Sequence, residues 1–139
     1  MIDRDQDKVI GYWKTDGASA NFPMALDESN HRLFIGCRQP ERLVVLNTDS
    51  GTVLSTVRIS GDTDDVFYDE NRHRIYVVCG EGAVDIINQV GPDSYKAETT
   101  VKTASGARTG LFVPELSSLF VAVPRQNGRK AEIRRYAVE

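Results

Sequence analysis

Residues 27–37 read DESNHRLFIGC and residues 69–79 read DENRHRIYVVC, so five positions carry the same residue 42 places apart. Each copy joins an acidic turn to an apolar run rich in residues that favour β-strands. A period in the low forties, with hairpin turns between short strands, is typical of the four-stranded blades of a β-propeller. We therefore predict an all-β fold built from repeated blades.

Alternating apolar residues and turn signals predict twelve strands along the chain. One strand stands alone at residues 8–14. The others form blade 1 (22–62), blade 2 (63–105) and three strands of blade 3 (106–139), within a single domain spanning residues 1–139. We expect the second strand of every blade to be buried between blades through Leu33, Ile35, Ile75, Val77, Leu119 and Val121.

Three blades are too few to close a ring on their own, because propellers usually contain about 4 to 8. Blade 3 lacks its outermost strand, and the lone strand at residues 8–14 lacks the inner strands of a blade. A strand exchanged between two copies would supply the missing edge in each. We therefore predict a homodimer in which two half-propellers form a six-bladed ring.

The charge balance excludes some classes of partner. The formal net charge is -3 and basic residues are spread thinly, which argues against a nucleic-acid partner. No apolar run approaches the roughly 20 residues of a membrane span, so we expect no membrane partner. Because the first residues lack the apolar core of a signal peptide, we predict a cytoplasmic location, or a periplasmic one if the chain is part of a longer exported protein.

The two cysteines, Cys37 and Cys79, occupy equivalent places at the ends of apolar strands. We expect them to be free, buried thiols, because two cysteines in successive repeats do not make a disulfide framework. His31 and His73 lie in the turns of different blades, too far apart to share a metal ion.

The stretches RLFIGC, RLVVLNTDSGTVLSTV, RIYVVC and AVDIINQ resemble the repeats of YVTN-type, YncE-like β-propeller proteins, and the resemblance extends from Lys8 onward. Members usually have about twice as many blades. The chain is therefore similar to the C-terminal half of a longer member, whether it is a half-length gene product or a fragment. The resemblance implies binding of a ligand or a protein, and it transfers no catalytic residue to these positions.

The segments that lead into the innermost strands of a propeller usually line one mouth of its channel. We aligned these segments on Asp27, Asp69 and Pro114. The alignment predicts a binding site made of Asn21, Asp64, Asp65, Arg108 and Thr109. If the site holds a metal, Ca²⁺ on Asp64 and Asp65 is the expected one, whereas the arginines would suit a small anion, and no other cofactor is expected. The alternative is that the two aspartates only cap a turn.

The leading functional prediction is a non-enzymatic binding module, a homodimer that presents its channel mouth to a small molecule or a protein. The alternative is a metal-dependent enzyme of the lactonase or lyase kind, because some six-bladed propellers hold a divalent metal in the channel as a Lewis acid. A third interpretation is an inactive fragment of a larger propeller.

The loops that follow the second strands would extend the mouth, or are simply solvated. Their residues are Arg38, Gln39, Glu41, Arg125, Gln126 and Arg129.

Overall fold

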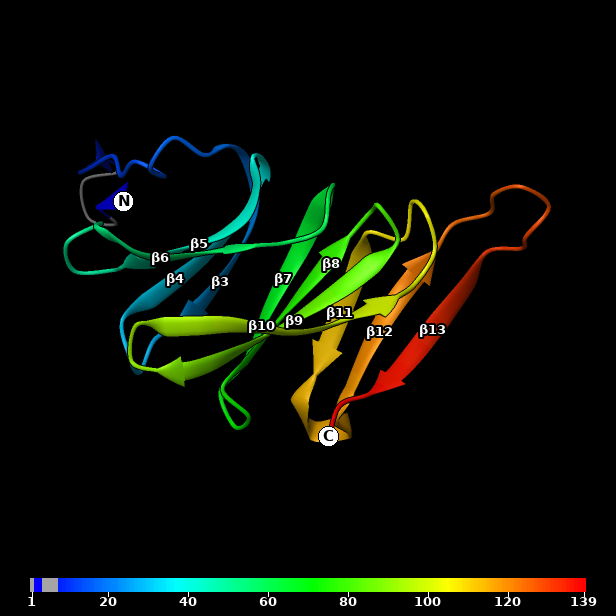
Figure 1. Cartoon of the computed structure of the whole chain (residues 1–139). Coiled ribbons are helices and arrows are strands. Elements are labelled where there is room, and N and C mark those ends of the chain that lie inside the picture. The colour runs from blue at the N-terminus through cyan, green and yellow to red at the C-terminus, as the bar shows by residue number, and fades with distance from the viewer. Residues whose placement is uncertain (1, 4–7) are drawn as a thin grey trace.

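The computed structural model describes residues 2–3 and 8–139, with the blades standing side by side (Figure 1). Blade 1 contains β3 (Ser19–Asp27), β4 (Arg32–Gln39), β5 (Glu41–Asn47) and β6 (Val53–Arg58). Blade 2 contains β7 (Thr63–Asp69), β8 (Arg74–Cys79), β9 (Ala83–Gly91) and β10 (Ser94–Lys102). Blade 3 contains β11 (Thr109–Val113), the short 3-10 helix η1 (Pro114–Leu116), β12 (Ser118–Val123) and β13 (Glu132–Ala137). The strands of each blade follow chain order, so the predicted all-β fold of three blades is confirmed.

The repeated acidic motif builds the same turn in blades 1 and 2. Asp27 and Asp69 are buried, and the carboxylate of each accepts the backbone N–H of the residue three positions later, at 3.1 Å and 3.2 Å. His31 and His73 then adopt left-handed φ angles of 57° and 51°. The repeated aspartate therefore has a structural role, since it closes the hairpin between the first two strands of its blade.

Apolar seams hold the blades together. We call the side of a blade that faces the preceding blade its back face and the other side its front face. The front face of blade 1 and the back face of blade 2 share a core that includes Phe34, Leu43, Val45, Val66, Ile75, Val77 and Ile87. The front face of blade 2 and the back face of blade 3 share a second core that includes Tyr76, Val78, Val84, Leu119 and Val121.

Five of the six second-strand residues predicted to be buried are at most 4% exposed. The exception is Leu33, which is only partly buried. Its side chain belongs to the back face of blade 1, where the described residues include no preceding blade to cover it. The equivalent residue of blade 2, Ile75, is 0% exposed because blade 1 packs on it.

Polar contacts also join blade 1 to blade 2. The Arg32 guanidinium lies 2.6 Å from Asp93 in the β9–β10 hairpin. Asp85 is buried on the back face of blade 2, where its carboxylate accepts the backbone N–H of Ser60 at 2.5 Å and the hydroxyl of Thr100 at 2.7 Å. Since Ser60 lies in the connection between the blades, Asp85 fixes how that connection crosses the sheet.

The two outermost sheet faces carry exposed apolar side chains. On the back face of blade 1, Met24 and Leu26 are 62% and 54% exposed. On the front face of blade 3, Leu111 and Ile133 are 58% and 68% exposed. The same face holds an apolar groove of about 510 Å³ lined by Thr109, Gly110, Leu111, Val113, Leu116, Phe120, Ala122 and Ile133. Exposed apolar patches of this kind commonly mark interaction sites.

The N-terminal segment covers part of the back face of blade 1. In the described residues, β2 (Lys8–Val9) pairs with β1 (Ile2–Asp3), and the strand predicted over residues 8–14 does not continue beyond Val9. Blade 3, whose β13 edge is open, lies at the other end of the row of blades (Figure 1), so this segment does not reach that edge within one chain. Trp13 instead packs on the back-face core of blade 1.

Both cysteines are free and buried, as predicted. Burial is the main cause that raises the pKa of Cys79 to about 12. Across residues 2–3 and 8–139, the fold has no helix long and apolar enough to cross a membrane.

Candidate functional site

The predicted mouth is built where β3, β7 and β11 begin. Because β4 runs antiparallel to β3, its last residues return to this end, and Arg38 reaches from blade 1 to blade 2. Its Nε donates to the Thr63 carbonyl at 2.9 Å, and its terminal nitrogens lie 2.9 Å from Asp64 and 3.2 Å from Asp62. The segment leading into β7 is therefore held by one arginine from the neighbouring blade.

Asp62 also contacts blade 3. Its Oδ2 lies 3.0 Å from Nη2 of Arg108, while its carbonyl accepts the Gly80 N–H at 2.7 Å. A Cβ at Gly80 would collide with the Asp62 carboxylate and lie 3.2 Å from Nε of Arg108, so glycine leaves room for this pair. Arg38, Asp62 and Arg108 thus form an ion-paired chain that crosses all three blades at the mouth.

The two neighbouring aspartates point to different blades. Asp64 pairs with Arg38 of blade 1, whereas Oδ2 of Asp65 accepts the Gly110 N–H of blade 3 at 2.7 Å. Burial raises the pKa of Asp65, and the hydrogen bond from Gly110 partly opposes that rise. In this arrangement the two carboxylates act as separate inter-blade contacts and do not form a shared ligand pair.

Asn21 and Thr109 lie outside the ion-paired chain. Both are exposed; Asn21 faces Cys37 across the strand pair, and Thr109 lines the apolar groove of blade 3.

The strand register also corrects the alignment on which the site was predicted. Val66 pairs with Val77 as Gly110 pairs with Val121, so the third repeat shifts by one residue.

With this correction, Thr109 is equivalent to Asp65, because Thr109 pairs with Ala122 as Asp65 pairs with Val78. The prediction had placed Thr109 one position earlier, at Asp64. The error lies at the turn on which the repeats were aligned, because Val113 pairs with Ser118 as Asp69 pairs with Arg74. Val113 is therefore the counterpart of Asp69, and Pro114 instead begins η1.

Asp62 was not predicted as part of the site, although Arg38 was predicted as a residue that could extend the mouth. The signal for Asp62 was the density of acidic residues in the GDTDD segment. A further contact strengthens this corner, because the Arg38 guanidinium carbon lies 4.2 Å from the centroid of the Phe22 ring. Cation–π contacts of this kind hold a guanidinium in place while leaving its edge available.

The mouth carries two guanidinium groups and three carboxyl groups, and it suits recognition by hydrogen bonds and ion pairs. Side-chain exposures of 25% for Arg38, 31% for Asp62 and 43% for Arg108 leave each group in contact with solvent. Over the part of the chain that the structure describes, no group of three or more His, Cys, Asp or Glu residues lies close enough to hold a metal ion. The five predicted site residues stay a prediction; of these, Asp64 and Arg108 are joined through Arg38 and Asp62.

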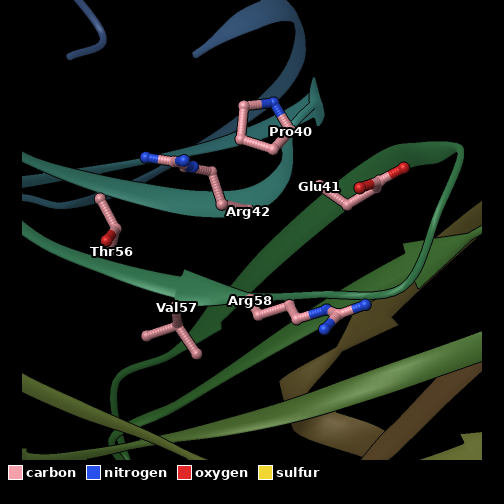
Figure 2. Close-up of a pocket in the computed structure, with 6 residues that line it drawn as sticks. All are labelled: Pro40, Glu41, Arg42, Thr56, Val57 and Arg58. Atoms are coloured by element: carbon pink, nitrogen blue, oxygen red, sulfur yellow. The ribbon is translucent and has the colours of Figure 1, made fainter. Parts of the chain in front are cut away.

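A second depression of about 390 Å³ lies beside the β5–β6 pair and is lined by Pro40, Glu41, Arg42, Thr56, Val57 and Arg58. Arg42 and Arg58 face each other in the strand register. Figure 2 shows that their side chains extend in opposite directions, Arg42 over Thr56 and Arg58 along its own strand. The two guanidinium groups therefore do not converge on a common anion.

Comparison with known proteins shows the fold. No protein-family model matches the sequence, and no curated protein matches it. Among solved structures, the chain is similar to hydrazine synthase from Kuenenia stuttgartiensis, with a TM-score of 0.83, 14% identity, and coverage of 98% of this chain and 38% of that chain. It is also similar to a "putative 6-phosphogluconolactonase" from Bacteroides uniformis, with a TM-score of 0.67, 14% identity, and coverage of 86% and 37%. The chain thus has a β-propeller-like all-β fold and spans under two fifths of either neighbour.

Proposed function

We propose that this chain is a non-enzymatic binding module, in which two copies close a six-bladed ring and present a channel mouth to a small molecule or a protein. One observation carries the proposal. Repeat positions that are buried where blades meet inside the chain are exposed on the back face of blade 1 and the front face of blade 3.

The back face of blade 1 matches the back face of blade 2 position by position. Met24 pairs with Ile35 as Val66 pairs with Val77. Val66 is 5% exposed because blade 1 covers it, whereas Met24 is 62% exposed. This face therefore has the composition of an internal seam without its partner.

The front face of blade 3 matches the front face of blade 2 in the same way. Leu111 pairs with Phe120 as Phe67 pairs with Tyr76. Phe67 is partly buried in the second seam, whereas its counterpart Leu111 is 58% exposed. Inside the chain, the front face of one blade packs on the back face of the next. A second copy of this chain offers such a back face on its blade 1.

Two copies joined in this way contain six blades, within the usual range of about 4 to 8, whereas three copies would exceed it. The N-terminal segment supports the same arrangement. The outer strand of blade 1 lies over the back face of blade 2, and its Val57 packs on the core that the two blades share. Trp13 packs similarly on the back face of blade 1, which supports the proposal that residues 8–14 pair with the open β13 edge of a second copy.

The ring would present every mouth residue twice. Asn21, Asp64, Asp65, Arg108 and Thr109 remain the proposed ligand contacts, together with Arg38 and Asp62. Paired arginines and aspartates favour a ligand that carries both hydrogen-bond donors and acceptors. The resemblance to YVTN-type, YncE-like repeats agrees with a binding role and is part of this proposal.

The second candidate function is a metal-dependent lactonase or lyase. Similarity to the Bacteroides uniformis structure favours it, although that similarity extends to the fold alone. Ca²⁺ would then bind at Asp64 and Asp65 after their present partners separate. Elemental analysis after purification in Ca²⁺ distinguishes the two functions, since a bound metal that is lost in Asp64→Ala supports the enzyme.

The mass of the chain in solution tests the ring. We expect a dimer by sedimentation equilibrium at micromolar concentration, and aggregation or dissociation when residues 1–14 are deleted. A monodisperse monomer, or a dimer unaffected by the deletion, would contradict closure by strand exchange. A monomer would also favour the third interpretation, in which a longer chain supplies the remaining blades.

A further inference from the structure

The ring proposed above has a specific anchoring contact. We infer that the Phe120 side chain of one copy packs between Leu26 and Trp13 of the second copy. The inference rests on the proposed homodimer and adds to it the residues that decide its affinity. Its template is a contact already present inside the chain.

Phe34 is that template. It is 0% exposed, on the front face of blade 1. Its ring centroid lies 5.1 Å from that of Tyr68 and 5.7 Å from that of Tyr95, both on blade 2. The first seam is therefore centred on one aromatic ring that sits between two others, a geometry that adds stability beyond burial.

Phe120 is the blade 3 counterpart of Phe34, since each is the third residue of the second strand of its blade. It lines the apolar groove of about 510 Å³ on the front face. No blade follows blade 3 in the described residues, so this ring has no equivalent of Tyr68 and Tyr95 to pack on.

The back face of blade 1 rebuilds both walls of that site with different residues. Leu26 takes the place of Tyr68, because each directly precedes the buried aspartate of its turn. Leu26 is 54% exposed, as expected for a wall that lacks its occupant.

Gly51 takes the place of Tyr95. Val53 in the outer strand of blade 1 and Ala97 in the outer strand of blade 2 pair with equivalent positions of their third strands, and Gly51 and Tyr95 each lie two residues before them. The indole of Trp13 covers Gly51, where an added Cβ would collide with it. An aromatic ring from the N-terminal segment therefore fills the volume that Tyr95 fills in blade 2.

Charge at the edge of this seam is complementary as well. Arg135 lies on the front face of blade 3, where its Nε donates to the Ser118 hydroxyl at 2.9 Å. The Asp49 side chain, in the hairpin that also holds Gly51, is 70% exposed. Opposite charges on the two faces favour this pairing over front-to-front contact of two copies.

Trp13 is the only tryptophan of the chain, so its emission reports on this contact directly. We expect the emission of the full chain to shift to the blue as concentration rises through the dimer dissociation constant. Phe120→Ala should raise that constant about 1,000-fold, since a central interface residue contributes at least about 30-fold and acts at both seams. Leu26→Ala, on the opposite wall, should weaken the dimer in the same direction.

Val90→Ala is the matched control, because Val90 is 61% exposed on blade 2, away from either end face. It should leave both the dimer and the emission unchanged, and circular dichroism should show all three variants folded. If the wild type is a dimer, and neither Phe120→Ala nor Leu26→Ala alters the dissociation constant or the Trp13 emission, the inference is overturned while the ring is left intact. A wild-type monomer at every concentration overturns the ring itself.

Discussion

Replacing Phe34 by leucine measures how much the central contact of the first seam contributes to stability. The ring is 0% exposed and contacts the rings of Tyr68 and Tyr95 at 5.1 Å and 5.7 Å. Leucine keeps most of the buried apolar area but loses both aromatic pairs, which contribute about 0.5 to 1.5 kcal/mol each. We therefore expect Phe34→Leu to lower the free energy of unfolding by about 1 to 3 kcal/mol.

Urea denaturation at fixed protein concentration gives this quantity, provided that the slope of free energy against urea is unchanged. Val90→Ala serves again as control, with an expected change within about 0.5 kcal/mol because that residue is exposed. If Phe34→Leu fell in the same narrow range as the control, the first seam would not be organised around this ring. The repeat equivalence with Phe120 would then lose its basis.

Three further predictions concern buried groups. Ile75→Ala should destabilise the fold by about 1 to 4 kcal/mol in the same urea assay, since Ile75 is 0% exposed and its removal leaves a cavity; a near-neutral effect would contradict the register. The pKa of Asp65 is raised above 3.8 by burial, so its contribution to stability is present below that pH and is lost as the pH rises through the raised value. Stability of the wild type measured between pH 3 and pH 7 should therefore decline relative to Asp65→Asn, and parallel curves would refute the assignment. Because the pKa of Cys79 is about 12 and both thiols are buried, thiol reagents at pH 8 should label them only after unfolding; rapid labelling of the native chain would show the seams to be open.

The blade architecture was predictable because the repeat encodes it twice. The DE and HR pairs fix a turn, and the apolar run that follows fixes the buried central strand, so Ile75 and Val77 could be identified without coordinates. The depth of burial of Leu33 was not predictable from its own repeat. The burial of Leu33 depends on whether another blade packs on the back face of blade 1, and the local sequence does not reveal that.

The mouth was less predictable for a different reason. Asp64 and Arg108 were identified from divergence between repeats, but Asp62, which links Arg108 to Arg38, was not, because an ion pair depends on side-chain direction across two blades. The one-residue shift in the third repeat came from its first turn, where Val113 and not Pro114 is the counterpart of Asp69. This turn is built by η1 and lacks the aspartate that marks the turn in the other two repeats.

The two end faces of the row of blades differ from each other, and this difference has a consequence for growth. A contact between a front face and a back face is heterologous, so the angle between blades alone decides whether two copies meet in a closed ring or continue as an open filament. The Arg38, Asp62 and Arg108 chain spans both internal seams. In the proposed assembly, a substitution in this chain that changes the angle would therefore convert discrete rings to fibres, even where each blade keeps its fold.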